Sequence, residues 1–237
     1  MKYTSFATYA EMSAAAADIV AAQLRAKPAS VLGLATGSTP IGMYDRLAEL
    51  HKAGALDFSL ASSVNLDEYI GLPPTHDQSY RFFMNKYLFS RVNIPIERTN
   101  VPSGVAPDPD AECARYDALI ESLGGTDIQV LGIGVDGHIG FNEPADAFST
   151  GTNCVDLDPS TIEANARFFA SADDVPRRAI TMGMSGIMGS RHVLLLAAGP
   201  AKKDILERSM HGPVTPRVPA SILQFHPNVT VLFAEKG

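Results

Sequence analysis

Hydrophobic positions along the chain follow two alternating patterns, short continuous apolar runs and longer amphipathic stretches. A continuous run predicts a strand buried on both faces, and such runs lie at 30–35, 64–66, 128–133, 179–184, 192–198 and 229–233. Amphipathic stretches predict helices at 39–54, 79–92, 108–125 and 200–210, after a first helix that ends before Pro28. This alternation predicts an α/β fold with a mostly parallel central sheet and helices on both faces, a Rossmann-like three-layer arrangement.

Hydroxyl residues mark where two of these helices begin. Thr8 and Glu11 have the spacing of a capping box, in which each side chain bonds the other residue's backbone N–H. Thr39 precedes Pro40 as an N-cap residue precedes a first-turn proline. We therefore expect a side-chain cap at both places.

The composition excludes several classes of protein. The 237 residues, 46% hydrophobic and 19% charged, fit a single globular domain over residues 1–237. The net charge of -7 argues against non-specific binding to nucleic acid or to an anionic membrane. No apolar run is long enough to span a membrane and no secretion signal is evident, so we expect a cytoplasmic protein. Cys113 and Cys154 are too few for a disulfide framework and are expected to be reduced thiols.

Polar, glycine-rich clusters follow the ends of four apolar runs. They lie at 36–39, 67–69, 134–138 and 199–202. In an open parallel sheet, the ligand crevice lies at the carboxyl ends of the strands. The sequence therefore predicts that four separate segments converge on one site.

The first of these clusters suits a phosphate group. Gly37, Ser38 and Thr39 lie between a predicted strand and a predicted helix, where backbone N–H groups and the helix dipole favour an anion. The cluster lacks the Gly-Lys-[Ser/Thr] ending of a Walker loop, and a simple capped turn is the alternative. Arg167 and Lys202 are distant cations that would complete a phosphate site, although each could equally be a solvated surface charge.

Two other clusters carry groups for proton transfer. Asp67 ends a predicted strand, where a partly desolvated carboxylate can act as a general base, with a helix cap or a surface acid as the alternative. Asp136, His138 and Glu143 lie within eight residues among four glycines. A carboxylate beside a histidine orients the ring and favours its protonated form, which is the arrangement of a proton shuttle. A metal site and a purely structural loop are the alternatives.

Several of these segments together resemble the glucosamine-6-phosphate deaminase family. The resemblance lies in the residues at 35–40, 65–69, 134–144, 164–169 and 223–227, in order along nearly the whole chain. The Asp-Gly-His-Ile-Gly-Phe-Asn-Glu-Pro stretch at 136–144 is its most specific part. The resemblance implies conversion of glucosamine 6-phosphate and water to fructose 6-phosphate and ammonia. It also implies a sugar phosphate as the ligand, with no redox cofactor and no catalytic metal.

The resemblance assigns a role to each candidate residue. His138 would move a proton at the sugar ring oxygen, Asp136 and Glu143 would orient and charge-balance His138, and Asp67 would transfer a proton between C2 and C1. The phosphate would be held by Gly37, Ser38, Thr39, Arg167 and Lys202. Residues from about 145 to 169 would form a lid over the carboxyl ends of the strands.

The chain departs from the allosteric, hexameric members of that family. Those members carry an Arg and a Lys in the lid segment, and the corresponding positions here are Asn153 and Val155. The chain also ends at Gly237, soon after the last predicted strand. The sequence is therefore similar to the short, non-allosteric branch, and we expect a monomer rather than a hexamer.

Two other functions remain open from the residues. The 6-phosphogluconolactonases share the fold and a similar Gly-x-Asp-Gly-His segment, but they typically have an Arg where this chain has Tyr69. They also lack the Asn-Glu-Pro sequence at 142–144. A non-catalytic sugar-phosphate sensor is the second alternative, and the presence of Asp67 and His138 argues against it.

Overall fold

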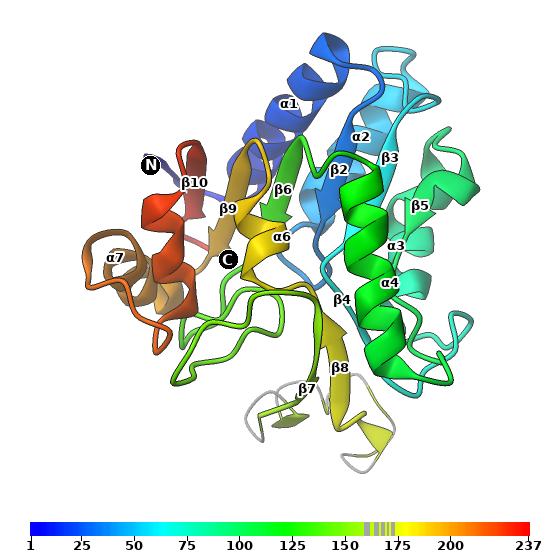
Figure 1. Cartoon of the computed structure of the whole chain (residues 1–237). Coiled ribbons are helices and arrows are strands. Elements are labelled where there is room, and N and C mark those ends of the chain that lie inside the picture. Colours follow the sequence, from blue (N-terminus) through cyan, green and yellow to red (C-terminus); the bar gives the residue numbers. More distant parts are fainter. Residues whose placement is uncertain (159–161, 164–165, 167–168, 170, 172–173) are drawn as a thin grey trace.

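The computed structural model describes residues 1–158, 162–163, 166, 169, 171 and 174–237, and its centre is a sheet of seven strands (Figure 1). Every neighbouring pair in this sheet is parallel. In spatial order the strands are β1 (Lys2–Phe6), β10 (Val229–Ala234), β9 (Val193–Ala198), β6 (Ile128–Leu131), β2 (Val31–Leu34), β3 (Ser62–Asn65) and β5 (Thr99–Asn100). The central strands β2 and β6 are buried along their whole length, as their continuous apolar runs predict.

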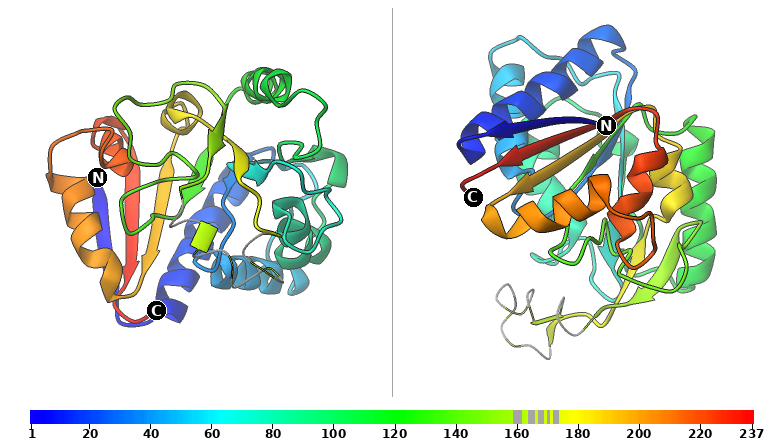
Figure 2. Two further views of the ribbon diagram at one scale, coloured as in Figure 1. Left: turned by 90° about the horizontal axis from the view of Figure 1, so that it is seen from below. Right: turned by 90° about the vertical axis from the view of Figure 1, so that its left-hand side faces the viewer.

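Helices cover both faces of this sheet, which confirms the predicted α/β class. Figure 2 shows α1 and α2 on one side, and α6 and α7 with the 3₁₀ helix η5 on the other. The α-helices are α1 (Tyr9–Ala26), α2 (Ile41–Lys52), α3 (Tyr80–Tyr87), α4 (Pro109–Ser122), α6 (Met184–Met188) and α7 (Lys203–His211). The 3₁₀ helices are η1 (Phe89–Arg91), η2 (Ile96–Arg98), η4 (Pro200–Lys202) and η5 (Pro219–Phe225).

The two predicted helix caps have different outcomes. The capping box between Thr8 and Glu11 is present at the start of α1. The prediction for Thr39 is wrong, because α2 starts one residue later and its N-cap residue is Pro40, which has no side-chain cap. The hydroxyl of Tyr9 takes over part of that task, because it accepts a hydrogen bond of 2.8 Å from the backbone N–H of Gly42.

A second, antiparallel sheet of three strands was not predicted. Its order is β4 (Asp67–Tyr69), β8 (Arg178–Thr181) and β7 (Asn153–Asp156). The run at 179–184 therefore does not join the parallel sheet as expected. The chain passes from β3 through Leu66 directly into β4, and Leu66 bonds both sheets: its N–H donates to Leu34 and its carbonyl accepts from Met182. An apolar run predicts burial but does not specify which sheet the strand joins.

Two further expectations concern cysteines and membranes. The Sγ atoms of Cys113 and Cys154 lie 3.7 Å apart and are not bonded covalently, in agreement with reduced thiols. Burial raises the pKa of the Cys113 thiol to about 12, which keeps it protonated.

Within the described part of the chain, no helix combines the length and the apolar character needed to cross a membrane.

Candidate active site

The four predicted polar clusters lie at one edge of the central sheet. They follow β2, β3, β6 and β9, and these four strands are immediate neighbours in the order β9-β6-β2-β3. Because the strands are parallel, their carboxyl ends meet at the same edge. The predicted convergence is confirmed.

His138 is held at this edge by two carboxylates. Its Nδ1 atom lies 2.9 Å from Oδ1 of Asp136 and 3.0 Å from Oε2 of Glu143. The same Asp136 oxygen accepts the backbone N–H of His138 at 3.1 Å. Both acids thus converge on one ring nitrogen and fix the ring from that side, which leaves Nε2 as the nitrogen available to a substrate.

Glycines make room for this arrangement. A Cβ atom at Gly134 would lie 2.3 Å from Cε1 of His138 and 2.6 Å from Oδ1 of Asp136, so any other residue would displace the pair. Gly137 adopts a φ of +98°, in the left-handed region that glycine enters without strain. The glycine-rich sequence is therefore required for the imidazole to pack against its own loop.

The two carboxylates control the protonation of His138. Burial by itself would lower the pKa of the imidazole, but the contacts with Asp136 and Glu143 outweigh it and raise the pKa to about 9. Burial also opposes ionisation of Asp136, yet its contacts with His138 bring the pKa of that carboxyl below its usual range. At neutral pH, the site holds an imidazolium with an ionised partner.

Asp67 lies on β4, against the same loop. It is 6% exposed, and its Oδ2 atom lies 3.5 Å from the point where a Cβ on Gly140 would be. Burial and, to a smaller extent, the neighbouring Glu68 raise the pKa of Asp67, His138 lowers it in part, and the net result is a pKa of about 8. A raised pKa at a buried carboxyl near a histidine is typical of a group that exchanges protons.

The loop at 36–40 is anchored by two tyrosines. Tyr9 donates from its hydroxyl toward the carbonyls of Ser38 at 3.1 Å and Thr39 at 3.0 Å. Tyr44 donates to the carbonyl of Ala35 at 2.6 Å. Gly37 has a φ of +89° and open space around it, and Gly37 and Ser38 are exposed. The loop is thus fixed from behind, and its open side lies at the start of α2, where a phosphate is favoured.

The structure describes one of the two predicted cations. Lys202 is the last residue of η4, the short helix that follows Gly199, and it is half-buried. Burial lowers the pKa of its amine, and the proximity of Asp136 opposes this, which places Lys202 near the His138 loop. Arg167 lies outside the described residues.

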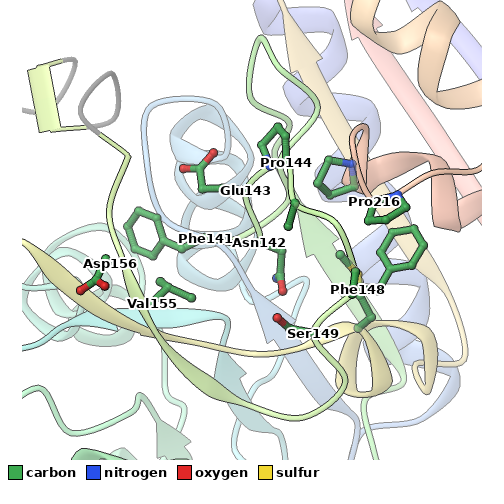
Figure 3. A pocket seen from close by; sticks show the side chains of 13 residues that line it. Phe141, Asn142, Glu143, Pro144, Phe148, Ser149, Val155, Asp156 and Pro216 are labelled. Atoms are coloured by element: carbon green, nitrogen blue, oxygen red, sulfur yellow. The ribbon is translucent and has the colours of Figure 1, made fainter.

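Two cavities lie near these residues. One, of about 280 Å³, lies between the loop of Gly37 and Ser38, Tyr69 of β4 and the first residues of α3. The other, of about 260 Å³, lies between the chain that follows His138, strand β7 and the turn at Pro216. Figure 3 shows Phe141, Asn142 and Glu143 along the wall of this second cavity.

The sequence of this chain is similar to those of known proteins. The model of the glucosamine-6-phosphate isomerases/6-phosphogluconolactonase family matches residues 4–232. The chain belongs to this family. Among relatives in the family, a glucosamine-6-phosphate deaminase of Lachnoclostridium phytofermentans is 59% identical over 98% of both chains. A glucosamine-6-phosphate deaminase of a Geobacillus species is 56% identical over 98% of this chain and 92% of its own.

Solved structures of the family agree with the fold. A monomeric glucosamine-6-phosphate deaminase matches with a TM-score of 0.96 and 46% identity, over 99% of this chain and 97% of the other. A 6-phosphogluconolactonase from Thermotoga maritima matches with a TM-score of 0.74 and 22% identity, over 99% of both chains. The likeness to the 6-phosphogluconolactonase, at this low identity, shows a shared fold and no more.

Asp136, His138 and Glu143 are also residues that could hold a metal ion. One ligand atom from each lies within 4.8 Å of the others. Metal binding to this cluster would require an unprotonated ring nitrogen. The raised pKa of His138 favours a proton there instead, so the donor set fits an ion pair better than a metal site.

Sequence reasoning missed three residues that shape the site. Tyr9 holds the loop at 36–40, Glu68 lies beside Asp67, and Thr181 accepts the backbone N–H of Phe141 at 3.0 Å through its Oγ1 atom. Tyr9 and Thr181 act across long stretches of chain, so no local pattern indicates them. Glu68 had a local signal, because two adjacent acids at the end of an apolar run are unusual in a buried strand.

Proposed function

We propose that this protein is a glucosamine-6-phosphate deaminase, which converts glucosamine 6-phosphate and water to fructose 6-phosphate and ammonia. The observation that carries the proposal is the imidazole of His138, held between two carboxylates and close to the separately buried Asp67. Relatives of that name, aligned over nearly the whole chain, support it. Because water enters and ammonia leaves, the reaction is a hydrolytic deamination coupled to an aldose–ketose isomerisation.

The first step opens the sugar ring. The imidazolium of His138 donates a proton to the ring oxygen while the C1–O bond breaks, and the neutral imidazole takes up the proton that the C1 hydroxyl loses as the aldehyde forms. Asp136 and Glu143 hold the ring and balance its charge before and after the transfer. A positioned acid of this kind contributes about 100- to 10,000-fold to a rate.

The second step moves a proton from C2 to C1. Asp67 removes the C2 proton while the imidazolium of His138 protonates the C1 oxygen, which gives an enolamine, and the protonated carboxyl of Asp67 then gives its proton to C1. C2 is then an imine, water adds to it, and ammonia leaves to give the ketone. A raised pKa suits Asp67 for this task, because a more basic carboxylate accepts a carbon-bound proton more readily.

The remaining residues bind the phosphate and enclose the sugar. Gly37, Ser38 and Thr39 present the start of α2 to the phosphate, and Lys202 supplies a charge. Arg167 takes the second cationic place by resemblance to the family. We further propose one catalytic domain with residues 145–169 as its lid, acting as a monomer.

A coupled assay for ammonia with glucosamine 6-phosphate tests the proposal, with no metal or nucleotide added. We expect turnover that withstands EDTA. Hydrolysis of 6-phosphogluconolactone without ammonia release would instead assign the lactonase activity. Binding of the sugar phosphate without either product would indicate a sensor.

A further inference from the structure

A second buried carboxylate lies beside Asp67 and has no part in the proposed reaction. Glu68 is 2% exposed. Its Oε1 atom accepts the backbone N–H groups of Tyr69 at 3.0 Å and Tyr80 at 2.8 Å, and its Oε2 atom accepts that of Arg81 at 3.0 Å. Two of these donors are the first residues of α3, so the carboxylate joins β4 to the start of that helix.

Glu68 shares the capping of α3 with Ser79, since it accepts the N–H groups of Tyr80 and Arg81. Ser79 already caps α3, because its Oγ atom accepts the N–H of Phe82 at 3.0 Å. The guanidinium of Arg81 donates to Thr99 at 2.7 and 2.8 Å. Glu68 is therefore bound chiefly by main-chain donors, and its specific effect is to connect a strand to a helix.

This connection bears on Asp67. Side chains alternate along a strand, so Asp67 and Glu68 point to opposite faces of β4. Fixing the Glu68 carboxylate at the start of α3 fixes the strand, and with it the direction of the Asp67 side chain. The connection also reaches the His138 loop, because the ring of Tyr80 stacks on Phe141 with a centroid distance of 6.1 Å and an interplanar angle of 11°.

We propose that Glu68 is a positioning residue: it holds β4 against α3 and so sets the direction from which Asp67 reaches the substrate. The inference rests on Asp67 as the base of the proposed function. It assigns Glu68 no contact with the sugar.

The electrostatics of the pair agree with the geometry. The groups that face Glu68 are Asp67 and Tyr69 on β4, and Tyr80 and Arg81 on α3. Burial raises the pKa of Glu68 to about 7, against the lowering effect of its three backbone donors and Arg81. When ionised, Glu68 raises the pKa of Asp67 in turn. A change at Glu68 should therefore alter the pH dependence of the reaction as well as its rate.

Glu68→Gln is the direct test. The amide keeps one acceptor oxygen but turns an NH₂ group toward a backbone N–H, and it removes the negative neighbour of Asp67. We expect kcat to fall about 10- to 100-fold, the scale of a small misplacement of a reacting group, with KM changed less than about threefold. We also expect the acid limb of kcat/KM to move to lower pH.

Glu112→Gln is the matched control. Glu112 on α4 is also buried and accepts a backbone N–H, that of Ser103 at 2.7 Å. Its loss should lower the melting temperature and leave kcat and the acid limb unchanged. If Glu68→Gln behaves in the same way, Glu68 is structural only and the inference is wrong.

Glu68→Asp is a second test, for use if the Glu68→Gln variant does not fold. It keeps the charge but shortens the side chain, so kcat should fall while the acid limb stays in place. A normal kcat in this variant would also overturn the inference. The wild-type protein distinguishes failure of the proposed function from failure of the proposal for Glu68. If the wild type releases no ammonia, the deaminase assignment itself is contradicted.

Discussion

Two buried aspartates at opposite ends of the central sheet have contrasting surroundings. Asp127 directly precedes β6 at the amino end and is 3% exposed. It lies 2.8 Å from Nζ of Lys27 and 3.1 Å from Nε of Arg191, and it accepts the N–H of Val31 at 2.8 Å. Asp67, at the carboxyl end, has the acid Glu68 as its chain neighbour instead.

The difference separates stability from reactivity. The carboxylate of Asp127 is matched by opposite charges, so it joins the starts of β2, β6 and β9. The carboxyl of Asp67 is left with an unfavourable charge, which makes it a stronger base. The raised pKa of Asp67 costs the folded protein some stability, and under the proposed function it makes the carboxylate a better base.

Asp67→Asn should give the largest effect on turnover. Asn keeps the shape but cannot accept the C2 proton, so kcat should fall about 100- to 10,000-fold. Because the folded-state pKa of Asp67 lies above its unfolded value, the wild type loses stability as the pH rises from about 4 to about 8. The variant lacks this loss, so its melting temperature at pH 8 should exceed that of the wild type. A near-normal kcat would remove Asp67 from the reaction.

The pH profile examines both groups of the site together. Asp67 must be ionised, so kcat/KM should rise as the pH approaches about 8. His138 must carry its proton, so kcat/KM should fall as the pH exceeds about 9. Two units below the pKa of the base, only about 1% is ionised, and kcat/KM near pH 6 should be about 100-fold below its maximum. An acid limb near pH 4 would show that burial does not raise the pKa of Asp67.

Lys202→Ala examines the cation at the catalytic end. A charge-assisted hydrogen bond of about 1.5–3 kcal/mol implies a rise in KM of about 10- to 150-fold. Lys203→Ala is the neighbouring control, because Lys203 is exposed at the start of α7, and its KM should not change. An equal KM in both variants would place the phosphate elsewhere.

Asp127→Asn is the counterpart at the amino end. Lys27 and Arg191 are partly exposed and can be rehydrated, so the loss of unfolding free energy should be about 1–3 kcal/mol. Denaturant unfolding measures it, and kcat should stay at the wild-type value under native conditions. A fall in kcat would mean that the two ends of the sheet are not independent.

We expect N-acetylglucosamine 6-phosphate not to activate the enzyme. The allosteric members of the family place two cations at the positions of Asn153 and Val155, on β7. Here Val155 and Asp156 line the second cavity, an apolar and an acidic side chain that do not favour a phosphate (Figure 3). Saturation by substrate should be hyperbolic. A Hill coefficient above one that the acetylated sugar lowers to one would contradict this.

The sequence predicts those elements of the fold that have a clear local pattern. Apolar runs identify β2, β6 and β9, and the polar clusters that follow them meet as expected. The small sheet could not be predicted, because the run at 179–184 is apolar like the runs of the large sheet and β4, one partner of β8, is distant in sequence. The role of Tyr9 depends on a carbonyl 29 residues away, which no local pattern indicates. The catalytic roles themselves stay predictions.

The pairing of β1 with β10 bears on how the chain is made. Lys2 pairs with Thr230 and Phe6 with Ala234, so β1 docks against a strand that is synthesised much later. Until β10 has been synthesised, β1 lacks the sheet partner that it has in the described structure, and contacts so far apart in sequence form slowly. The edge of the sheet that β1 forms is therefore among the last parts of the fold to be completed.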